Sequence, residues 1–371
     1  MMSKSVLISG AGVAGSTAAY WLSRNGFRVT VVERAAGERS SGNPVDVRGP
    51  AVDVVERMGI MPRLREVASA VDRLTFVDAA GRRRAGLSLR TFQSSGGDRE
   101  VEVPRAELAA TLLSAARDAA EIRWGDTITA LTPTPDGVDV RFEHAADEHF
   151  DLVVGADGLH STVRRLAFGP ESEFVRHMGM YVATLPVHRA IGDEREVVML
   201  NAPGRAFSVH PNRGKPLAAF MFRRSAAAGF DHRATDLHKR LVDEAFAGTL
   251  GPFANYLDEV RTADDLFFDS VSRVRLPHWT TGRITLLGDA GSSLSLFGDG
   301  STLAIAGAHT LATELSATPD NLPAALHRYE HRHRTLVRPK QRAFLLASKL
   351  LVPTTRAGIT ARNTAARTLT R

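Results

Sequence analysis

The chain has 371 residues, of which 43% are hydrophobic and 24% are charged, and its formal net charge is +6. It contains no cysteine, which excludes disulfides, thiolate metal sites and attachment of a cofactor through sulfur. The length is sufficient for two domains. Because basic and acidic residues are interspersed, we expect the charge to attract anionic cofactors and not nucleic acid.

The N-terminal segment predicts a strand, a glycine-rich turn, a helix and a second strand. The first apolar run leads into Gly10, Gly12 and Gly15, and a helix-like segment and a second apolar run then lead to Glu33. In such a unit the glycines allow a tight turn and a close approach of backbone to a pyrophosphate, and the acid accepts hydrogen bonds from a ribose. The combination predicts a dinucleotide-binding site.

The first apolar run is too short for a signal peptide or a membrane span. We therefore expect a cytoplasmic protein without stable membrane association, present as a monomer or a weak homodimer. His327 and His331 have i,i+4 spacing on a predicted helix. They lack the acid of a zinc-protease motif, so we expect no metal site there or elsewhere.

The rest of the chain predicts helices and short strands in an order typical of an interrupted α/β domain. Residues 81–84 are typical of a hairpin turn. The further helix-like segments are 52–58, 107–120 and 322–350, and the short strand candidates are 182–187, 196–200, 206–210 and 217–222. The four strand candidates indicate a strand-rich insertion at 176–275.

Two further apolar runs end in a turn that carries an aspartate. Residues 151–158 read as a strand followed by Asp157 and Gly158, and residues 283–291 as a strand followed by Gly288 and Asp289. An acid at the carboxyl end of a strand, beside a bound cofactor, can fix a sugar hydroxyl.

Together these motifs resemble those of the class A FAD-dependent monooxygenases with the para-hydroxybenzoate hydroxylase fold, and the chain is most similar to their tetracycline-hydroxylase-like branch. The segments that carry the resemblance are 10–15 with Glu33 and Arg34, 155–158 with Ser161 and Arg164, Gly288 with Asp289, and, more loosely, 103–108 with Arg105. The resemblance implies an α/β fold, in which a Rossmann-like FAD-binding domain is interrupted by a β-sheet substrate domain and followed by C-terminal helices. The expected boundaries are 1–75, 100–175 and 276–340 for the three parts of the FAD-binding domain, 76–99 for a hairpin of the substrate domain, 176–275 for its sheet, and 341–371 for a C-terminal helix and basic tail.

The resemblance also implies roles for single residues. Glu33 would hold the adenosine ribose, Arg34 and Arg105 would lie along FAD, Asp157 would face the region between FAD and NAD(P)H, and Asp289 would bind the ribityl chain or the pyrophosphate side. The expected cofactor-binding residues are Gly10, Gly12, Ala14, Gly15, Glu33, Arg34, Arg48, Arg105, Asp157, Asp289, Gly298, Gly300 and Ser301.

One loop departs from the family pattern. Residues 290–300 lack the histidine and the proline that usually follow the Gly-Asp motif. Gly298 and Gly300 still precede the helix-like run 303–306. We therefore expect free backbone N–H groups and a helix dipole to face the flavin N1–C2 carbonyl there.

The activity that the resemblance implies is oxygen transfer to an aromatic or polyketide-type substrate. NAD(P)H would reduce non-covalently bound FAD, and O2, the cosubstrate, would add to form a C4a-hydroperoxide that hydroxylates the ring. No later strand is followed by a second Gly-x-Gly-x-x-Gly, so NAD(P)H is expected to bind transiently. The candidate substrate residues are Arg205, His210, Phe220 and Phe222, with Phe207 and Met221 completing an apolar wall.

Two other functions remain open at the level of sequence. One is a flavin-dependent reductase or dehydrogenase on the same scaffold, and the other is a non-catalytic flavin-binding protein. A hydrolase has no support, because no serine lies in a Gly-x-Ser-x-Gly elbow. No side chain is assigned a catalytic role, since the flavin would carry the chemistry.

Overall fold

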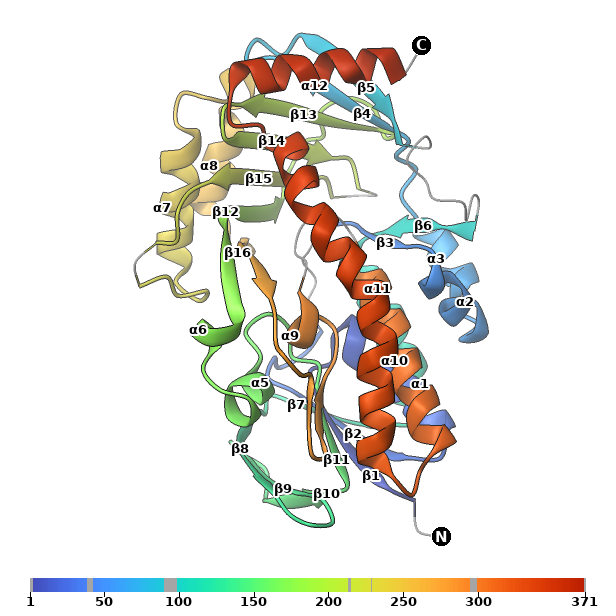
Figure 1. Cartoon of the computed structure of the whole chain (residues 1–371). Coiled ribbons are helices and arrows are strands. Elements are labelled where there is room, and N and C mark those ends of the chain that lie inside the picture. Colours follow the sequence, from blue (N-terminus) through green and yellow to red (C-terminus); the bar gives the residue numbers. More distant parts are fainter. Residues whose placement is uncertain are drawn as a thin grey trace.

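The computed structural model describes residues 3–38, 43–89, 99–212, 215–227, 229–293 and 299–369. Within these residues the strands form four sheets, and Figure 1 shows the largest two at opposite ends of the molecule. The N-terminus lies at the end that holds β1, and the C-terminus lies at the other end, beside β4 and β5 (Figure 1). No helix in the described part of the chain is both long enough and apolar enough to span a bilayer.

One sheet has six strands among the described residues, in the order β17-β18-β11-β1-β2-β7, and is called here the six-stranded sheet. Its strands pair in parallel, apart from the antiparallel pair β17–β18. Apolar residues run almost unbroken through its central strands, as expected for a parallel sheet covered on both faces. The strands are β1 Ser5–Ser9, β2 Arg28–Glu33, β7 Glu121–Trp124, β11 Leu152–Gly155, β17 Thr280–Thr281 and β18 Ile284–Leu286.

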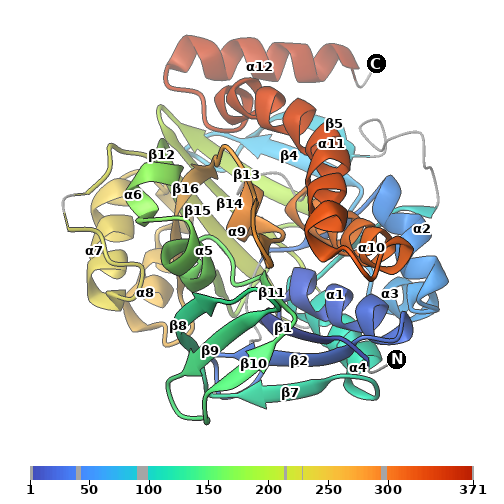
Figure 2. The same ribbon diagram turned by 60° about the horizontal axis from the view of Figure 1, so that its bottom comes forward.

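Helices surround this sheet. The contacts of α1 run to α4 on one side and to α10 on another, and α10 packs in turn against α11. Figure 2 shows α1 and α10 beside the sheet, with β8–β10 forming a small separate sheet. The elements are α1 Val13–Arg24, α2 Pro50–Arg57, α3 Met61–Glu66, α4 Arg105–Arg117, α5 Thr162–Ala167, α6 Glu171–Phe174, α9 Asp289–Ser292, α10 Asp299–Ala317, α11 Leu322–Leu351, β8 Ile128–Pro133, β9 Val138–Phe142 and β10 Glu148–Phe150.

A second large sheet has seven strands among the described residues, in the order β16-β12-β15-β14-β13-β4-β5, and is called here the seven-stranded sheet. The hairpin β4–β5 joins it through a parallel pairing of β4 with β13, so residues 73–88 and 175–274 share one sheet. The strands are β4 Arg73–Val77, β5 Arg83–Ser88, β12 Val175–Pro186, β13 Glu196–Ala202, β14 Arg205–His210, β15 Leu217–Arg223 and β16 Phe267–Val274. The four short strands expected from the sequence are confirmed as β12–β15.

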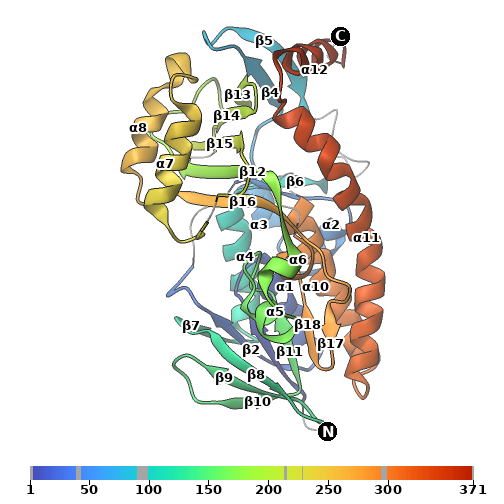
Figure 3. The same ribbon diagram turned by 60° about the vertical axis from the view of Figure 1, so that its left-hand side comes forward.

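The two faces of the seven-stranded sheet are covered differently. The outer face packs against α7 (Thr235–Phe246) and α8 (Asn255–Thr262), which follow one another across a short 3-10 turn at Gly251–Phe253. The opposite, inner face packs against Val352 and Ala366 from the C-terminal segment. Figure 3 shows α7 and α8 on one side of this sheet and α11 on the other.

The C-terminal segment forms α12, Arg356–Leu369, which crosses the end of the seven-stranded sheet (Figure 1). The guanidinium of Arg362 lies 3.8 Å from the ring centroid of Phe76 and donates a 2.8 Å hydrogen bond to Asn201. The sequence predicted a C-terminal helix and a basic tail in this segment. The structure contains the helix, which covers part of the seven-stranded sheet, because Ala366 is buried against the sheet and Arg362 is partly buried there.

A small two-stranded sheet lies between the two large ones. It consists of β3 (Val45–Val47) and β6 (Val101–Val103), paired antiparallel. Figure 1 shows it between the seven-stranded sheet and the start of α10. It therefore occupies the junction between the two halves of the molecule. The half that contains the six-stranded sheet, where the cofactor is expected, is called here the cofactor-binding half, and the half that contains the seven-stranded sheet is called the strand-rich half.

Candidate active site

The motifs that the sequence analysis singled out meet at one edge of the six-stranded sheet. Ser9, at the end of β1, pairs with Gly155 at the end of β11, and Gly155 pairs with Leu286 at the end of β18. The three turns that follow these strands therefore lie side by side. This edge, outside the carboxyl ends of parallel strands, is where open α/β sheets bind ligands.

The three glycines of the first turn differ in the space that surrounds them. Gly10 has φ +104°, and a Cβ there would lie 2.6 Å from the carbonyl oxygen of Ala156. A Cβ on Gly15 would lie 1.8 Å from the carbonyl oxygen of Gly10. A Cβ on Gly12 would meet nothing within 4 Å. Gly10 and Gly15 are thus required by the protein itself, whereas the space beside Gly12 is open at the N-terminus of α1.

Glu33 ties the first turn to β2. One carboxylate oxygen accepts a 3.0 Å hydrogen bond from the backbone N–H of Ala11, and the other accepts a 2.9 Å hydrogen bond from that of Ala35. The acid therefore positions the glycine-rich turn and retains lone pairs for a further donor. Arg34, next to it, is exposed.

The third turn presents a half-buried carboxylate, that of Asp289. Gly288 has φ +62°, and a Cβ there would lie 2.9 Å from the Cβ of Ala14, so this turn contacts the start of α1. Burial raises the pKa of Asp289, although the nearby charge of Arg105 opposes the shift. No hydrogen bond to the Asp289 carboxylate arises within the described residues. The group is therefore poised to accept one from a ligand.

The carboxylate of Asp157, in the second turn, is hydrogen-bonded to groups of its own turn. It accepts hydrogen bonds from Ser161 Oγ (2.5 Å) and from the backbone N–H of Val163 (3.0 Å) at the start of α5. Burial raises its pKa, against these hydrogen bonds. The sequence had suggested that Asp157 faces the cofactor; these contacts show that it also fixes the shape of its own turn.

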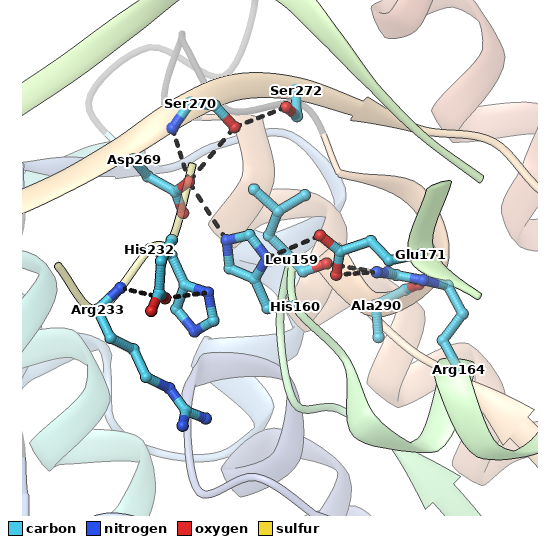
Figure 4. A network of polar contacts seen from close by, with 11 residues as sticks. Leu159, His160, Arg164, Glu171, His232, Arg233, Asp269, Ser270, Ser272 and Ala290 are labelled. Atoms are coloured by element: carbon cyan, nitrogen blue, oxygen red, sulfur yellow. Dashed lines mark hydrogen bonds and ion pairs between the residues drawn. The ribbon is translucent and has the colours of Figure 1, made fainter. Parts of the chain in front are cut away.

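Arg164 connects two of the motifs (Figure 4). Its side chain is fully buried, and it donates to the carbonyl oxygens of Leu159 (2.6 Å) and Ala290 (3.0 Å) and pairs with Glu171 (3.2 Å). The bond to Ala290 links the second turn to the third. Burial lowers the pKa of this guanidinium, against the attraction of Glu171.

His160, in the same turn, links the cofactor-binding half to the seven-stranded sheet. Its Nδ1 lies 3.0 Å from Glu171 and its Nε2 lies 3.3 Å from Asp269 on β16. Its ring stacks on His232 with centroids 4.0 Å apart (Figure 4). Burial alone would lower the pKa of His160, but the hydrogen bonds to the two carboxylates outweigh burial and raise it to about 9. His160 is therefore an imidazolium at neutral pH.

The start of α10 is fixed to β3. The hydroxyls of Ser301 and Thr302 donate hydrogen bonds of 2.8 and 3.0 Å to the backbone carbonyl of Asp46, and Thr302 accepts one of 3.1 Å from the backbone N–H of Arg48. The side chain of Arg48 pairs with Asp46 at 2.7 Å. Gly300 lies in the first turn of α10. Gly298, also expected at the cofactor, lies outside the described residues.

The structure corrects the expected substrate wall. Phe220 and Phe222 are 0% and 2% exposed and lie in the core between the outer face and α7 and α8. Arg205 shares their face and donates to the carbonyl oxygen of Ala245 on α7. The alternation of a strand places Phe220 and Met221 on opposite faces, and α7 and α8 cover the face with the phenylalanines. The side chains of Arg205, Phe220 and Phe222 therefore do not reach the cofactor-binding half.

His210 lies on the inner face instead, at the end of β14. Its Nε2 is 3.3 Å from Glu102 of β6. The sequence analysis missed Glu102 and its neighbour Asp46. A signal was present, because each acid stands between two valines in a short strand-like segment, Val45-Asp46-Val47 and Val101-Glu102-Val103.

The residues at the sheet edge fit a dinucleotide flavin. The N-terminus of α1 has no side-chain cap and opens on free space at Gly12, so its backbone N–H groups can receive a pyrophosphate. The half-buried Asp289 carboxylate can accept a hydrogen bond from a sugar-like hydroxyl. Glu33 lies at the end of β2, where a ribose binds in such folds.

Comparisons with known proteins agree with this site. The profile of the FAD binding domain family matches residues 3–340. A flavin-dependent monooxygenase of Legionella longbeachae is 32% identical over 92% of this chain and 88% of its own length. An uncharacterised protein of Mycobacterium tuberculosis is 36% identical over 90% of this chain and 92% of its own length. The crystal structure of tetracycline destructase Tet(55) superimposes with a TM-score of 0.84 at 31% identity, over 100% of this chain and 97% of that one. The chain therefore belongs to the FAD binding domain family, and within it to the flavin-dependent monooxygenases.

Proposed function

We propose that the protein uses NAD(P)H and O2 to insert one oxygen atom into a planar, electron-rich ring of aromatic or polyketide type. One O2 and one NAD(P)H are consumed for each hydroxyl group formed, and the second oxygen atom leaves as water. The observation that carries the proposal is the position of β3, β6 and the start of α10, which join the edge that fits FAD to the polar end of the inner face.

The chain's own residues would hold FAD non-covalently. The open backbone at Gly12 would receive the pyrophosphate, Glu33 the adenosine ribose, and Asp289 the ribityl chain. Arg34, Arg48 and Arg105 supply positive charge along the same edge. When bound, FAD supplies the redox and oxygen-transfer chemistry. The protein must orient the substrate and exclude water, so that reducing equivalents are not lost to free peroxide.

NAD(P)H would bind transiently. The sequence offers one Gly-x-Gly-x-x-Gly unit, and FAD would occupy it. We therefore expect a weakly bound hydride donor and no nicotinamide that copurifies with the protein. Tight stoichiometric binding of NADPH in the absence of substrate would contradict this part of the proposal.

The ring-shaped substrate is supported by the neighbours in structure and sequence. Two solved tetracycline destructases share the fold, with TM-scores of 0.85 and 0.84. A monooxygenase of Cercospora beticola is 33% identical over 87% of this chain. A tetracycline is a polycyclic molecule with a phenol ring and enol groups, which provide the electron-rich carbons that oxygen transfer of this kind requires.

The test is product analysis under labelled dioxygen. The FAD-loaded protein is incubated with NADPH, ¹⁸O2 and a panel of phenols, hydroxyanthraquinones and tetracyclines. We expect ligand-stimulated NADPH consumption and a product that carries one ¹⁸O. A product that gains only hydrogen, formed equally well without O2, would establish a reductase, and FAD binding without NADPH oxidation for any ligand would establish a non-catalytic flavoprotein.

A further inference from the structure

A continuous set of contacts leads from the start of α10 to the inner face of the seven-stranded sheet. Ser301 and Thr302 bind the carbonyl of Asp46 on β3. Asp46 is the direct partner of Glu102 in the antiparallel pairing of β3 with β6. Glu102 in turn contacts His210 on β14. Glu102 therefore lies one strand away from the proposed flavin site and also at the end of the substrate sheet.

The pKa values of the two carboxyl groups of this pair shift in opposite directions. Burial raises the pKa of Asp46 to about 7, although Arg48 opposes it. Burial would also raise the pKa of Glu102, but the hydrogen bonds from His210 and Ser69 and the charge of Arg48 hold it below its usual value. Like charges directly opposite in a sheet are unfavourable. Glu102 is therefore ionised at neutral pH, and of the two carboxyl groups Asp46 is the one that binds a proton first as the pH falls.

The hydrogen bonds of His210 orient the Glu102 carboxylate. Its Nδ1 accepts a 3.3 Å hydrogen bond from the backbone N–H of Asn212, so the ring proton lies on Nε2 and is donated to Glu102. The His210 side chain is only 12% exposed, whereas that of Glu102 is 30% exposed. The carboxylate is therefore held from the sheet side and keeps an accessible surface.

We propose that Glu102 accepts a hydrogen bond from a hydroxyl group on the substrate ring, and that His210 is the positioning residue that holds the carboxylate for it. The inference rests on the proposed function for the presence of a ring substrate, and it narrows that substrate to a hydroxylated ring. A ring that carries a carboxylate at this position is disfavoured, because it would face the ionised Glu102.

The chemistry of such a contact suits the proposed reaction. A hydroxyl that donates to a carboxylate forms a short, charge-assisted hydrogen bond, stronger than one between neutral groups. The bond draws the proton away from the ring oxygen and so raises the electron density on the ring carbons. An electron-rich ring carbon is the atom that an electrophilic oxygen donor attacks.

The experiment is a set of equilibrium titrations of the FAD-loaded protein without NAD(P)H, followed by the absorbance of the bound flavin. The probes are naphthalene and anthraquinone rings that carry a hydroxyl, a methoxy or a carboxylate group at the same position. We expect the native protein to bind the hydroxyl form of at least one ring about tenfold or more tightly than the methoxy form, which is the size of a lost hydrogen bond to a charged group. The carboxylate form is expected to bind most weakly.

Three variants test the assignment. Glu102→Gln should reduce the preference for hydroxyl over methoxy and improve binding of the carboxylate form about tenfold. His210→Leu should also reduce the preference, and His210→Gln, which retains an N–H donor, should restore it. Glu143→Gln, which removes an exposed negative charge just after the end of β9, is the matched control and should change neither ratio. Thermal unfolding of each variant identifies any that fails to fold.

The inference is overturned if the native protein binds none of the hydroxyl forms or prefers the carboxylate forms, or if folded Glu102→Gln retains the native ratios. These titrations need no turnover, so they fail independently of the proposed function. Binding through Glu102 without ¹⁸O incorporation would remove the proposed function alone. Incorporation of ¹⁸O with unchanged ratios in Glu102→Gln would remove the role of Glu102 alone.

Discussion

The cofactor edge of the six-stranded sheet and the outer face of the seven-stranded sheet differ in how completely protein groups fill them. At the cofactor edge, small residues and polar groups surround open space, and among the described residues no group fills the space beside Gly12 or hydrogen-bonds to the Asp289 carboxylate. In the seven-stranded sheet the outer face is closed by aromatic rings, among them Phe207 and Phe220, whose centroids are 5.0 Å apart. The first region is built to receive a ligand, and the outer face is built for stability.

The difference shows which features of a fold are local. The strongest steric demands within the glycine-rich turn arise from the backbone of a few residues, such as the 1.8 Å approach that a Cβ on Gly15 would make to the Gly10 carbonyl oxygen. The function of a strand residue in the seven-stranded sheet depends on what covers its face. Three pairs of substitutions and one pH series test this contrast.

The largest effect is expected within the glycine-rich turn. Gly15→Ala places a Cβ against the Gly10 carbonyl and should prevent folding of the N-terminal unit. Gly12→Ala meets no protein atom, and φ at Gly12 is −77°, which alanine adopts freely. The Gly12→Ala apoprotein should have the same unfolding temperature as the native apoprotein but should bind FAD more weakly, by about tenfold or more. Thermal unfolding and a fluorescence titration with FAD measure the two effects, and equal destabilisation by both substitutions would contradict the assignment.

The two faces of the seven-stranded sheet provide the second pair. Phe220 contacts Phe207 and Phe246 in the outer core, so Phe220→Ala should cost about 3–5 kcal/mol in the free energy of unfolding. Ser208, on the inner face, pairs with Ala219 across the strands, and Ser208→Ala should cost less than about 1 kcal/mol. Urea unfolding of the apoproteins gives both values. A small cost for Phe220→Ala would place that ring on a ligand-accessible wall after all.

The two acids at the cofactor edge form the third pair. Glu33→Gln loses a charge that accepts two backbone N–H groups, and should lower both FAD affinity and apoprotein stability, the latter by about 1–2 kcal/mol. Asp289→Asn removes a half-buried carboxylate whose pKa is raised by burial, and should weaken FAD binding while leaving the apoprotein as stable or more stable. Loss of apoprotein stability in Asp289→Asn would show that the carboxylate has a structural partner.

The pH series concerns the contact between the two regions. The pKa of His160 is raised from 6.5 to about 9 in the folded protein, against burial, by hydrogen bonds to Asp269 and Glu171. The folded state therefore binds the proton more tightly than the unfolded state. The stability from this group is complete below pH 6.5 and is lost as the pH rises through 9. Unfolding temperatures measured from pH 6 to 10 should fall more steeply for the native protein than for His160→Gln, and parallel curves would exclude the contact as a source of stability.

Much of the cofactor site was predictable because it depends on residues close together in sequence. The turns that contain Gly10, Asp157 and Asp289 each follow a strand, and parallel pairing of those strands brings the turns to one edge. The family comparison confirms the FAD-binding fold that these motifs indicated. The sequence did not reveal that Asp157 accepts hydrogen bonds from its own turn, because that depends on where α5 begins.

The sequence by itself determined the glycine-rich unit, the acidic turns and the positions of β12–β15, since a period of two and a Gly-x-Gly-x-x-Gly spacing are local patterns. Only the tertiary structure decided which face of each strand meets the cofactor-binding half. Alternation separates Phe220 from Met221, but it does not state which of them α7 and α8 will cover. The contact of Glu102 with His210 joins residues 108 positions apart, and no local pattern links them, because the geometry that unites them is the packing of one sheet against another.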